Sequence, residues 1–213
     1  SAPPEPSSTK RRVRYYLDAN IGMHSSPAAS LMKPHIVRCL ASAALGCHRL
    51  NRVCCRVLCR LTDELVKAYN LHQHMTICAC GTPALPWLPP QEVCRFHTDL
   101  YVRFLQQIAT HGIDIVDEAA NYALNVSVCF SETAWQYAQT YAGASVEAAS
   151  SLASGAADVS INWVGGQTHA RRDCAAGFSY VNDVVLAIQV VFAEHMDALR
   201  LQGGVAGTEV RPP

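Results

Sequence analysis

A histidine, His169, stands between two turns of small residues. Gly165-Gly166 precede it, Ala175-Ala176-Gly177 follow it, and the segment closes on Asn182-Asp183. Histidine is the residue type whose charge changes most readily near neutral pH. Small-residue turns let a backbone fold tightly against a small ligand. Without its sequence context, a histidine in a loop is more often a hydrogen-bonded structural residue than a functional one.

The sequence context of His169 resembles a known signature. The segment 158–183 reads DVSINWVGGQTHARRDCAAGFSYVND. It resembles the signature of the zinc-dependent histone deacetylases and of their bacterial acetyl-polyamine relatives. That family reads Trp-x-Gly-Gly-x-His-His-Ala and then Gly-Phe-Cys-Tyr-x-Asn-Asp. Two more stretches resemble the family, namely MKPH at 32–35 and CRFHTDLYVRFL at 94–105.

The chain departs from that signature at two positions. Thr168 stands where the family has the first histidine of its pair, and Ser179 stands where it has cysteine. The resemblance gives His169 the role of the second histidine, a general acid and base. Threonine can form hydrogen bonds but cannot exchange a proton near neutral pH. Losing one general acid or base typically costs ~10²–10⁴ in rate.

The resemblance also implies residues that bind substrate. Gly177 and Phe178 match the family's tunnel, where the aromatic ring packs on the methylene stem of acetyl-lysine. Asp99 matches the rim aspartate that accepts hydrogen bonds from the substrate backbone. Outside this resemblance, Phe178 would be a core residue, and Asp99 would be an acidic residue favoured at a helix start.

Zinc is the cofactor that the resemblance implies. It lowers the pKa of bound water to ~7 and polarises the carbonyl group. The family takes its ligands from an Asp-x-Asp-x-His-His strand end and from a later aspartate, and this sequence contains no such motif. We therefore expect no zinc to bind this chain. Cysteines and histidines between 47 and 80 could hold a structural zinc, but reduced, metal-free thiols are the favoured interpretation.

Alternating strands and helices must position these residues. Residues typical of strands predict strands at 13–17, 75–77 and 158–164. Apolar residues at helical spacing predict helices at 91–108, 131–154 and 181–196. This alternation predicts an α/β fold with a parallel sheet, whose ligand sites lie beyond the carboxyl ends of strands. The resemblance specifies the N-terminal part of an arginase/deacetylase-like parallel-sheet sandwich with helices on both faces.

Length and composition fit one folded domain. Half of the 213 residues are hydrophobic, and 17 basic residues balance 17 acidic ones. The balance gives no reason to expect direct contact with nucleic acid. No apolar run reaches the ~18–20 residues of a membrane span. We expect a flexible tail at 1–12, a partial deacetylase domain at 13–200 with an insertion at 41–62, and a tail unrelated to the family at 201–213.

Three functional hypotheses follow. The first is a deacetylase-family polypeptide that does not hydrolyse acetyl-lysine as it stands. The second is a non-catalytic relative that binds a partner or an acetylated tail, and the third is a truncated product without a stable function. For the first two, the resemblance implies an acetylated histone or other acetyl-lysine protein as ligand and corepressor-type protein partners. It also implies residence in the nucleus or cytoplasm.

Overall fold

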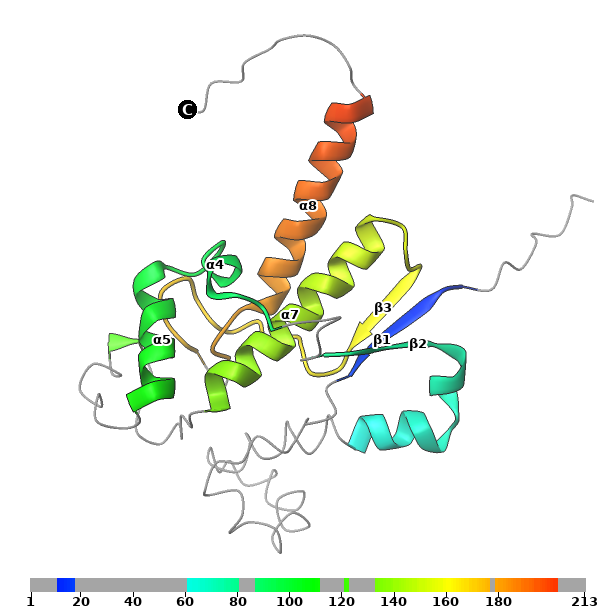
Figure 1. The fold of residues 1–213 in the computed structure, drawn as a ribbon, viewed down its shortest axis with the longest axis horizontal. Coiled ribbons are helices and arrows are strands. Elements are labelled where there is room, and N and C mark those ends of the chain that lie inside the picture. The colour runs from blue at the N-terminus through cyan, green and yellow to red at the C-terminus, as the bar shows by residue number, and fades with distance from the viewer. Residues whose placement is uncertain are drawn as a thin grey trace, which may run out of the picture.

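The computed structural model describes residues 11–17, 61–80, 87–111, 121–122, 133–176 and 179–202. These residues form a three-stranded parallel sheet with helices packed around it (Figure 1). The central strand is β1 (Val13–Leu17), and it pairs with β2 (Thr76–Ala79) on one side and β3 (Val159–Asn162) on the other. In the register, Tyr15 lies opposite Ile77 and Ile161.

Two adjacent tyrosines of β1 show how both faces of the sheet are covered. Successive side chains of a strand point to opposite faces. The Tyr15 hydroxyl donates a hydrogen bond to Asp63 Oδ1 at 3.0 Å, in the helical residues 61–68. The Tyr16 hydroxyl donates to the carbonyl oxygen of Glu147 at 3.3 Å, in α7 (Thr133–Ala153). The predicted α/β class, with a parallel sheet and helices on both faces, is confirmed.

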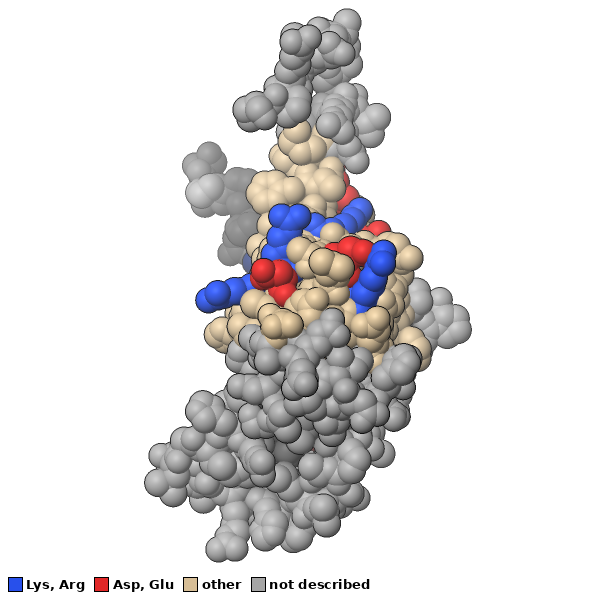
Figure 2. All heavy atoms as spheres, turned by 90° about the vertical axis from the view of Figure 1, so that its left-hand side faces the viewer, with Lys and Arg blue, Asp and Glu red and all other residues tan. Residues whose placement is uncertain are grey.

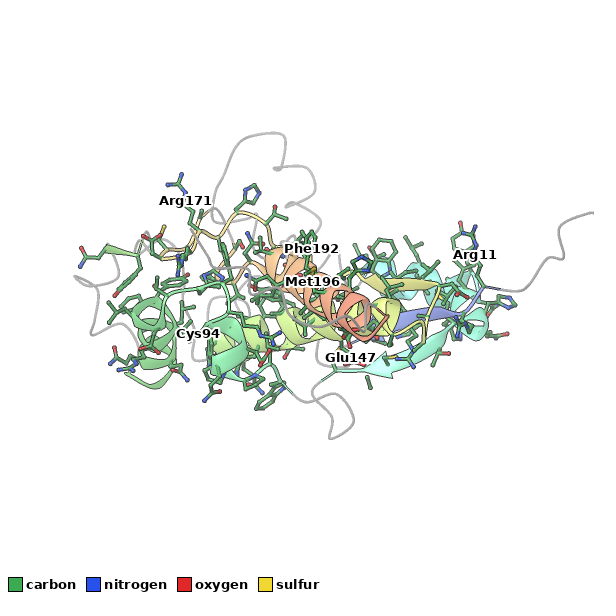
Figure 3. All side chains as sticks on the ribbon, turned by 90° about the horizontal axis from the view of Figure 1, so that it is seen from above. Arg11, Cys94, Glu147, Arg171, Phe192 and Met196 are labelled. Carbon is green, nitrogen blue, oxygen red and sulfur yellow. The ribbon has the colours of Figure 1, made fainter. Side chains whose placement is uncertain are left out.

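Helix α7 links the sheet to the last helix, α8 (Asp183–Gln202). Its inward face is rich in alanine, which allows close packing of neighbouring elements. The C-terminal half of α8 extends away from the body (Figure 1). The helix carries exposed apolar side chains at helical spacing, namely Ile188, Phe192 and Met196, and Figure 3 labels the last two. Residues 197–202 continue the helix beyond its predicted end at 196.

The helix predicted over 91–108 is wrong as a single element. The structure has a short α4 (Pro90–Val93) and a separate α5 (Asp99–His111). The break follows from a tertiary contact, because the amide of Thr98 donates to the carbonyl of Arg172 at 2.9 Å. The Thr98 hydroxyl then accepts the amide of Tyr101 at 3.4 Å, which helps to start α5.

The main hydrophobic core lies between α5, α7 and the start of α8. Two buried tyrosines anchor it through their hydroxyls. Tyr101 donates to the carbonyl of Tyr180 at 2.9 Å, and Tyr141 bonds to both the carbonyl and the amide of Val181 at 2.9 Å. Burial raises the pKa of both tyrosines, so both stay neutral. The chain just before α8 is therefore held at two successive residues.

Several sequence predictions fall outside the described residues. They concern the tail to residue 10, the segment 18–60 with most of the predicted insertion, and the Pro-rich loop at 81–86. The predicted tunnel residues Gly177 and Phe178 also lie there. Within the described part, β2 begins one residue after the predicted start, and β3 is shorter than predicted. None of the described helices combines the length and the apolar composition of a membrane span.

Candidate functional site

The chain leaves β3 and enters the loop 163–170, which contains the two glycines and His169. The two glycines meet different requirements. A Cβ on Gly165 would lie 2.5 Å from Asp183 Oδ2, 2.5 Å from Ser145 Oγ and 2.7 Å from Asn162 Nδ2. Gly166 has open space around it but a φ of +83°, in the left-handed region that favours glycine. The first glycine therefore allows a close approach, and the second allows a turn.

A buried carboxylate lies beneath this turn. Asp183, which is fully buried, accepts hydrogen bonds from the amide of Gly166 at 2.9 Å and the amide of Gln167 at 2.7 Å. Ser145 Oγ donates to it from α7 at 2.5 Å and accepts a bond from Asn162 Nδ2 at 2.9 Å. Burial raises the pKa of Asp183, although the hydrogen bonds act in the opposite direction.

A buried histidine ties Arg172, just after the loop, to the start of α8. His97 Nε2 accepts the amide of Asn182 at 3.0 Å, which leaves its Nδ1 to donate to the carbonyl of Arg172 at 3.2 Å. These two bonds assign the neutral tautomer with the proton on Nδ1. Burial lowers the pKa of His97 to about 4. His97 is thus a neutral structural link.

Ser179 adds a bond where the family signature has cysteine. Its hydroxyl is buried and donates to the carbonyl of Gln167 at 2.8 Å. A thiol is a weaker donor than a hydroxyl and needs a longer contact. The serine therefore strengthens the hold on the glycine turn.

Ser179→Cys is expected to lower the free energy of unfolding by about 1 kcal/mol, the usual net contribution of one buried hydrogen bond. Chemical denaturation followed by circular dichroism measures this change. Ser154→Cys is a matched control, because Ser154 is exposed and its hydroxyl bonds within its own helical turn. A stability of Ser179→Cys at or above that of the unmodified chain would show that the Gln167 bond contributes nothing.

The structure places the predicted catalytic positions on this loop. Thr168 and His169 both have exposed side chains, while Ala170 beside them is buried. Arg171, just beyond, points away from the body (Figure 3). The predicted acid–base role of His169 stays a prediction, as does the effect of threonine at 168.

Asp99 lies close to the loop in the fold. It begins α5, one residue after Thr98, whose amide bonds to the carbonyl of Arg172. Its carboxylate is exposed and forms an ion pair with Arg103, with 2.8 Å between Oδ2 and Nη2. Basic and acidic side chains intermingle on the face of the molecule that Figure 2 shows. Exposed pairs of this kind contribute little energy and exchange readily. The carboxylate of Asp99 is therefore available to another donor.

Sequence reasoning missed the polar residues that hold the loop. No role was predicted for Ser145, Asn162 or His97, and Asn182-Asp183 were seen only as the end of the segment. A usable signal existed for His97, which lies inside the family-like stretch 94–105. For Ser145, within an Ala- and Ser-rich helix, no local signal points to a carboxylate thirty-eight residues away.

Fold and site together define a class of protein. It is an α/β protein with a parallel sheet, and a glycine loop at the carboxyl end of a strand carries an exposed histidine. A sequence model described as the histone deacetylase domain matches residues 54–200. The chain belongs to the histone deacetylase family.

Individual relatives agree with this assignment. The chain is 32% identical to histone deacetylase 19 of Arabidopsis thaliana over 191 residues, which cover 89% of this chain and 33% of that protein. It is 30% identical to histone deacetylase RPD3 of Saccharomyces cerevisiae, with 88% of this chain and 37% of that protein covered. It is 31% identical to histone deacetylase B of Dictyostelium discoideum, with coverages of 91% and 39%. The chain thus spans between 33% and 39% of the length of these relatives.

The family is zinc-dependent, but the described residues do not fit a zinc ion. Within the part of the chain that the structure describes, no group of three or more His, Cys, Asp or Glu side chains is placed to hold a metal ion. Asp183 uses its carboxylate oxygens for two backbone amides and a serine, and His97 uses both ring nitrogens. The donor atoms of both residues therefore serve the protein's own hydrogen bonds and not a metal ion.

Proposed function

We propose that this chain binds N-acetyl-lysine of a histone or another protein through the loop 163–170, in the manner of a deacetylase. The observation that carries this proposal is the presentation of His169, whose side chain is exposed on a loop with a hydrogen-bonded backbone. Membership of the histone deacetylase family supports acetyl-lysine as the ligand.

Two other regions complete the proposed site. Asp99 accepts hydrogen bonds from the substrate backbone, after its exposed ion pair with Arg103 has opened. Gly177 and Phe178 contact the methylene stem of the lysine. The two residues that flank this pair are bonded to each other. The backbone amide of Ala176 donates to the carbonyl of Ser179 at 3.2 Å, and the amide of Ser179 donates to the carbonyl of Ala176 at 3.0 Å.

We further propose that residues 1–213 do not hydrolyse the acetyl-lysine amide by themselves. Amide hydrolysis requires an activated water and a proton for the leaving amine. His169 could move a proton, but Thr168 cannot act as its partner in acid–base chemistry. Binding without hydrolysis is also what the hypothesis of a non-catalytic relative expects.

The test uses the purified 213-residue chain and a matched pair of peptides, one acetylated at a lysine and one unmodified. We expect fluorescence anisotropy to show about tenfold tighter binding of the acetylated peptide, a difference of about 1.4 kcal/mol. We expect zinc well below one ion per chain and no turnover above that of His169→Ala. Equal binding of both peptides contradicts the acetyl-lysine proposal. Stoichiometric zinc, with a rate that His169→Ala abolishes, contradicts the proposed lack of hydrolysis.

A further inference from the structure

We propose that Asn182 is a positioning residue for His169, because a single side-chain amide fixes the backbone on both sides of that histidine. Its Nδ2 donates to the carbonyl of Thr168 at 3.0 Å and to the carbonyl of Ala170 at 3.1 Å. A side-chain amide has two N–H donors, and both are used here. This inference rests on the proposed function only in giving His169 a ligand to act on.

The hydrogen bonds accepted by the backbone carbonyls of residues 168–172 follow a regular pattern. The carbonyls of residues 168 and 170 bond to Asn182, and the carbonyl of residue 172 bonds to His97. Every second carbonyl thus faces the start of α8 and the buried imidazole, as an extended backbone allows. The side chain of His169 stays exposed. A histidine on a backbone fixed in this way loses little further freedom when a ligand binds.

His97 connects the backbone of Asn182 to the backbone of Arg172. The main-chain amide of Asn182 donates to His97 Nε2, and His97 Nδ1 donates to the carbonyl of Arg172. Asn182 therefore bonds directly to two carbonyls of the loop, and through His97 it is linked to the carbonyl of Arg172 just after the loop. Both residues are almost fully buried, so water does not compete for these bonds.

The oxygen and the nitrogen of the Asn182 side-chain amide bond to different parts of the chain. Its Oδ1 accepts the amide of Val185 at 3.2 Å and caps the first turn of α8. Its Nδ2 serves only the loop in the described residues. Asn182→Ser and Asn182→Asp keep an oxygen for the cap and remove the two N–H donors of Nδ2. Loss of the bonds to the loop can therefore be separated from loss of the helix.

Gln139→Ser is the matched control. Gln139 Nε2 also donates a side-chain amide hydrogen bond to a backbone carbonyl, but its partner is the carbonyl of Leu88 at 2.8 Å, which lies just before α4 and outside the loop. In the 213-residue chain, each variant is measured for its melting temperature and for amide hydrogen exchange over residues 168–172. The imidazole NMR signals of His169 and the affinity for an acetyl-lysine peptide are measured on the same samples.

We expect Asn182→Ser to speed exchange over 168–172 by about tenfold or more, to move the His169 ring signals, and to weaken binding of the acetylated peptide by about tenfold. Gln139→Ser should leave these three readouts within about twofold of the unmodified chain, even at an equal loss in melting temperature. Equal changes in both variants, or unmoved His169 signals in folded Asn182→Ser, would overturn the proposal.

A measurement on the unmodified chain covers the case in which the Asn182 variants do not fold. Both Nδ2 protons of Asn182 should exchange with solvent about a hundredfold more slowly than those of the exposed Asn70. Exchange of Asn182 as fast as that of Asn70 would overturn the proposal. If the unmodified chain does not prefer the acetylated peptide, the proposed function fails, while the His169 signals and the exchange rates still test the positioning.

Discussion

Gly165→Ala is expected to lower the free energy of unfolding by about 3 kcal/mol, combining overpacking with weakened buried hydrogen bonds. The added methyl group would lie 2.5 Å from both Asp183 Oδ2 and Ser145 Oγ. The carboxylate cannot simply move aside, because it also holds the amides of Gly166 and Gln167. Chemical denaturation followed by circular dichroism measures the loss.

Gly166→Ala is the matched control one residue away. A Cβ there meets nothing within 4 Å, so the expected cost is only the ~1–2 kcal/mol of a left-handed backbone at an L residue. A larger loss in Gly165→Ala than in Gly166→Ala identifies the contact with Asp183 as the dominant requirement. The reverse order would mean that backbone conformation, rather than the buried carboxylate, makes the Gly-Gly pair necessary.

Acidification from about pH 6.5 to about pH 4 is expected to remove about 3 kcal/mol of folding stability through His97. Burial lowers the pKa of His97 in the folded chain to about 4, against 6.5 as its ordinary value. Between these two pH values, His97 binds a proton in the unfolded chain but not in the folded chain. Stability is therefore fully present above pH 6.5 and is lost as pH falls toward 4. Denaturation curves at a series of pH values measure this slope.

His97→Gln is expected to flatten the slope, since glutamine can accept and donate hydrogen bonds without titrating. Asp183 changes the folding stability with pH in the opposite direction to His97. Burial raises the pKa of Asp183, so its ionised form lowers the stability of the folded chain. As pH falls toward its raised pKa, protonation relieves that cost and opposes the loss at His97. A slope between pH 6.5 and 4 that is the same with and without His97 would contradict the assignment of a buried neutral imidazole.

Regular elements with strong local patterns were predictable from the sequence. The strand Val13–Leu17 has the predicted bounds, and α7 lies within two residues of them. Both depend on side-chain periodicity and on β or helical preference, which act over a few neighbouring residues. The family resemblance was equally local, because it depended on short runs of residues such as those around His169.

Element ends were less predictable wherever a distant group competes for the backbone. The break between α4 and α5 exists because Thr98 bonds to Arg172, seventy-four positions away in the chain. Helix α8 likewise extends to Gln202, beyond its predicted end at 196.

By itself, the sequence determined the family, the α/β class and the loop on which a functional histidine would lie. Its local runs of glycine, histidine and strand-forming residues contain that information. Only the tertiary structure decided how the loop is held, by Asp183 and Ser145 on one side and by Asn182 and His97 on the other. The physical reason is that a buried polar group must find a partner. Folding brings together partners from α7, α8 and the α4–α5 connection that no spacing in the sequence reveals.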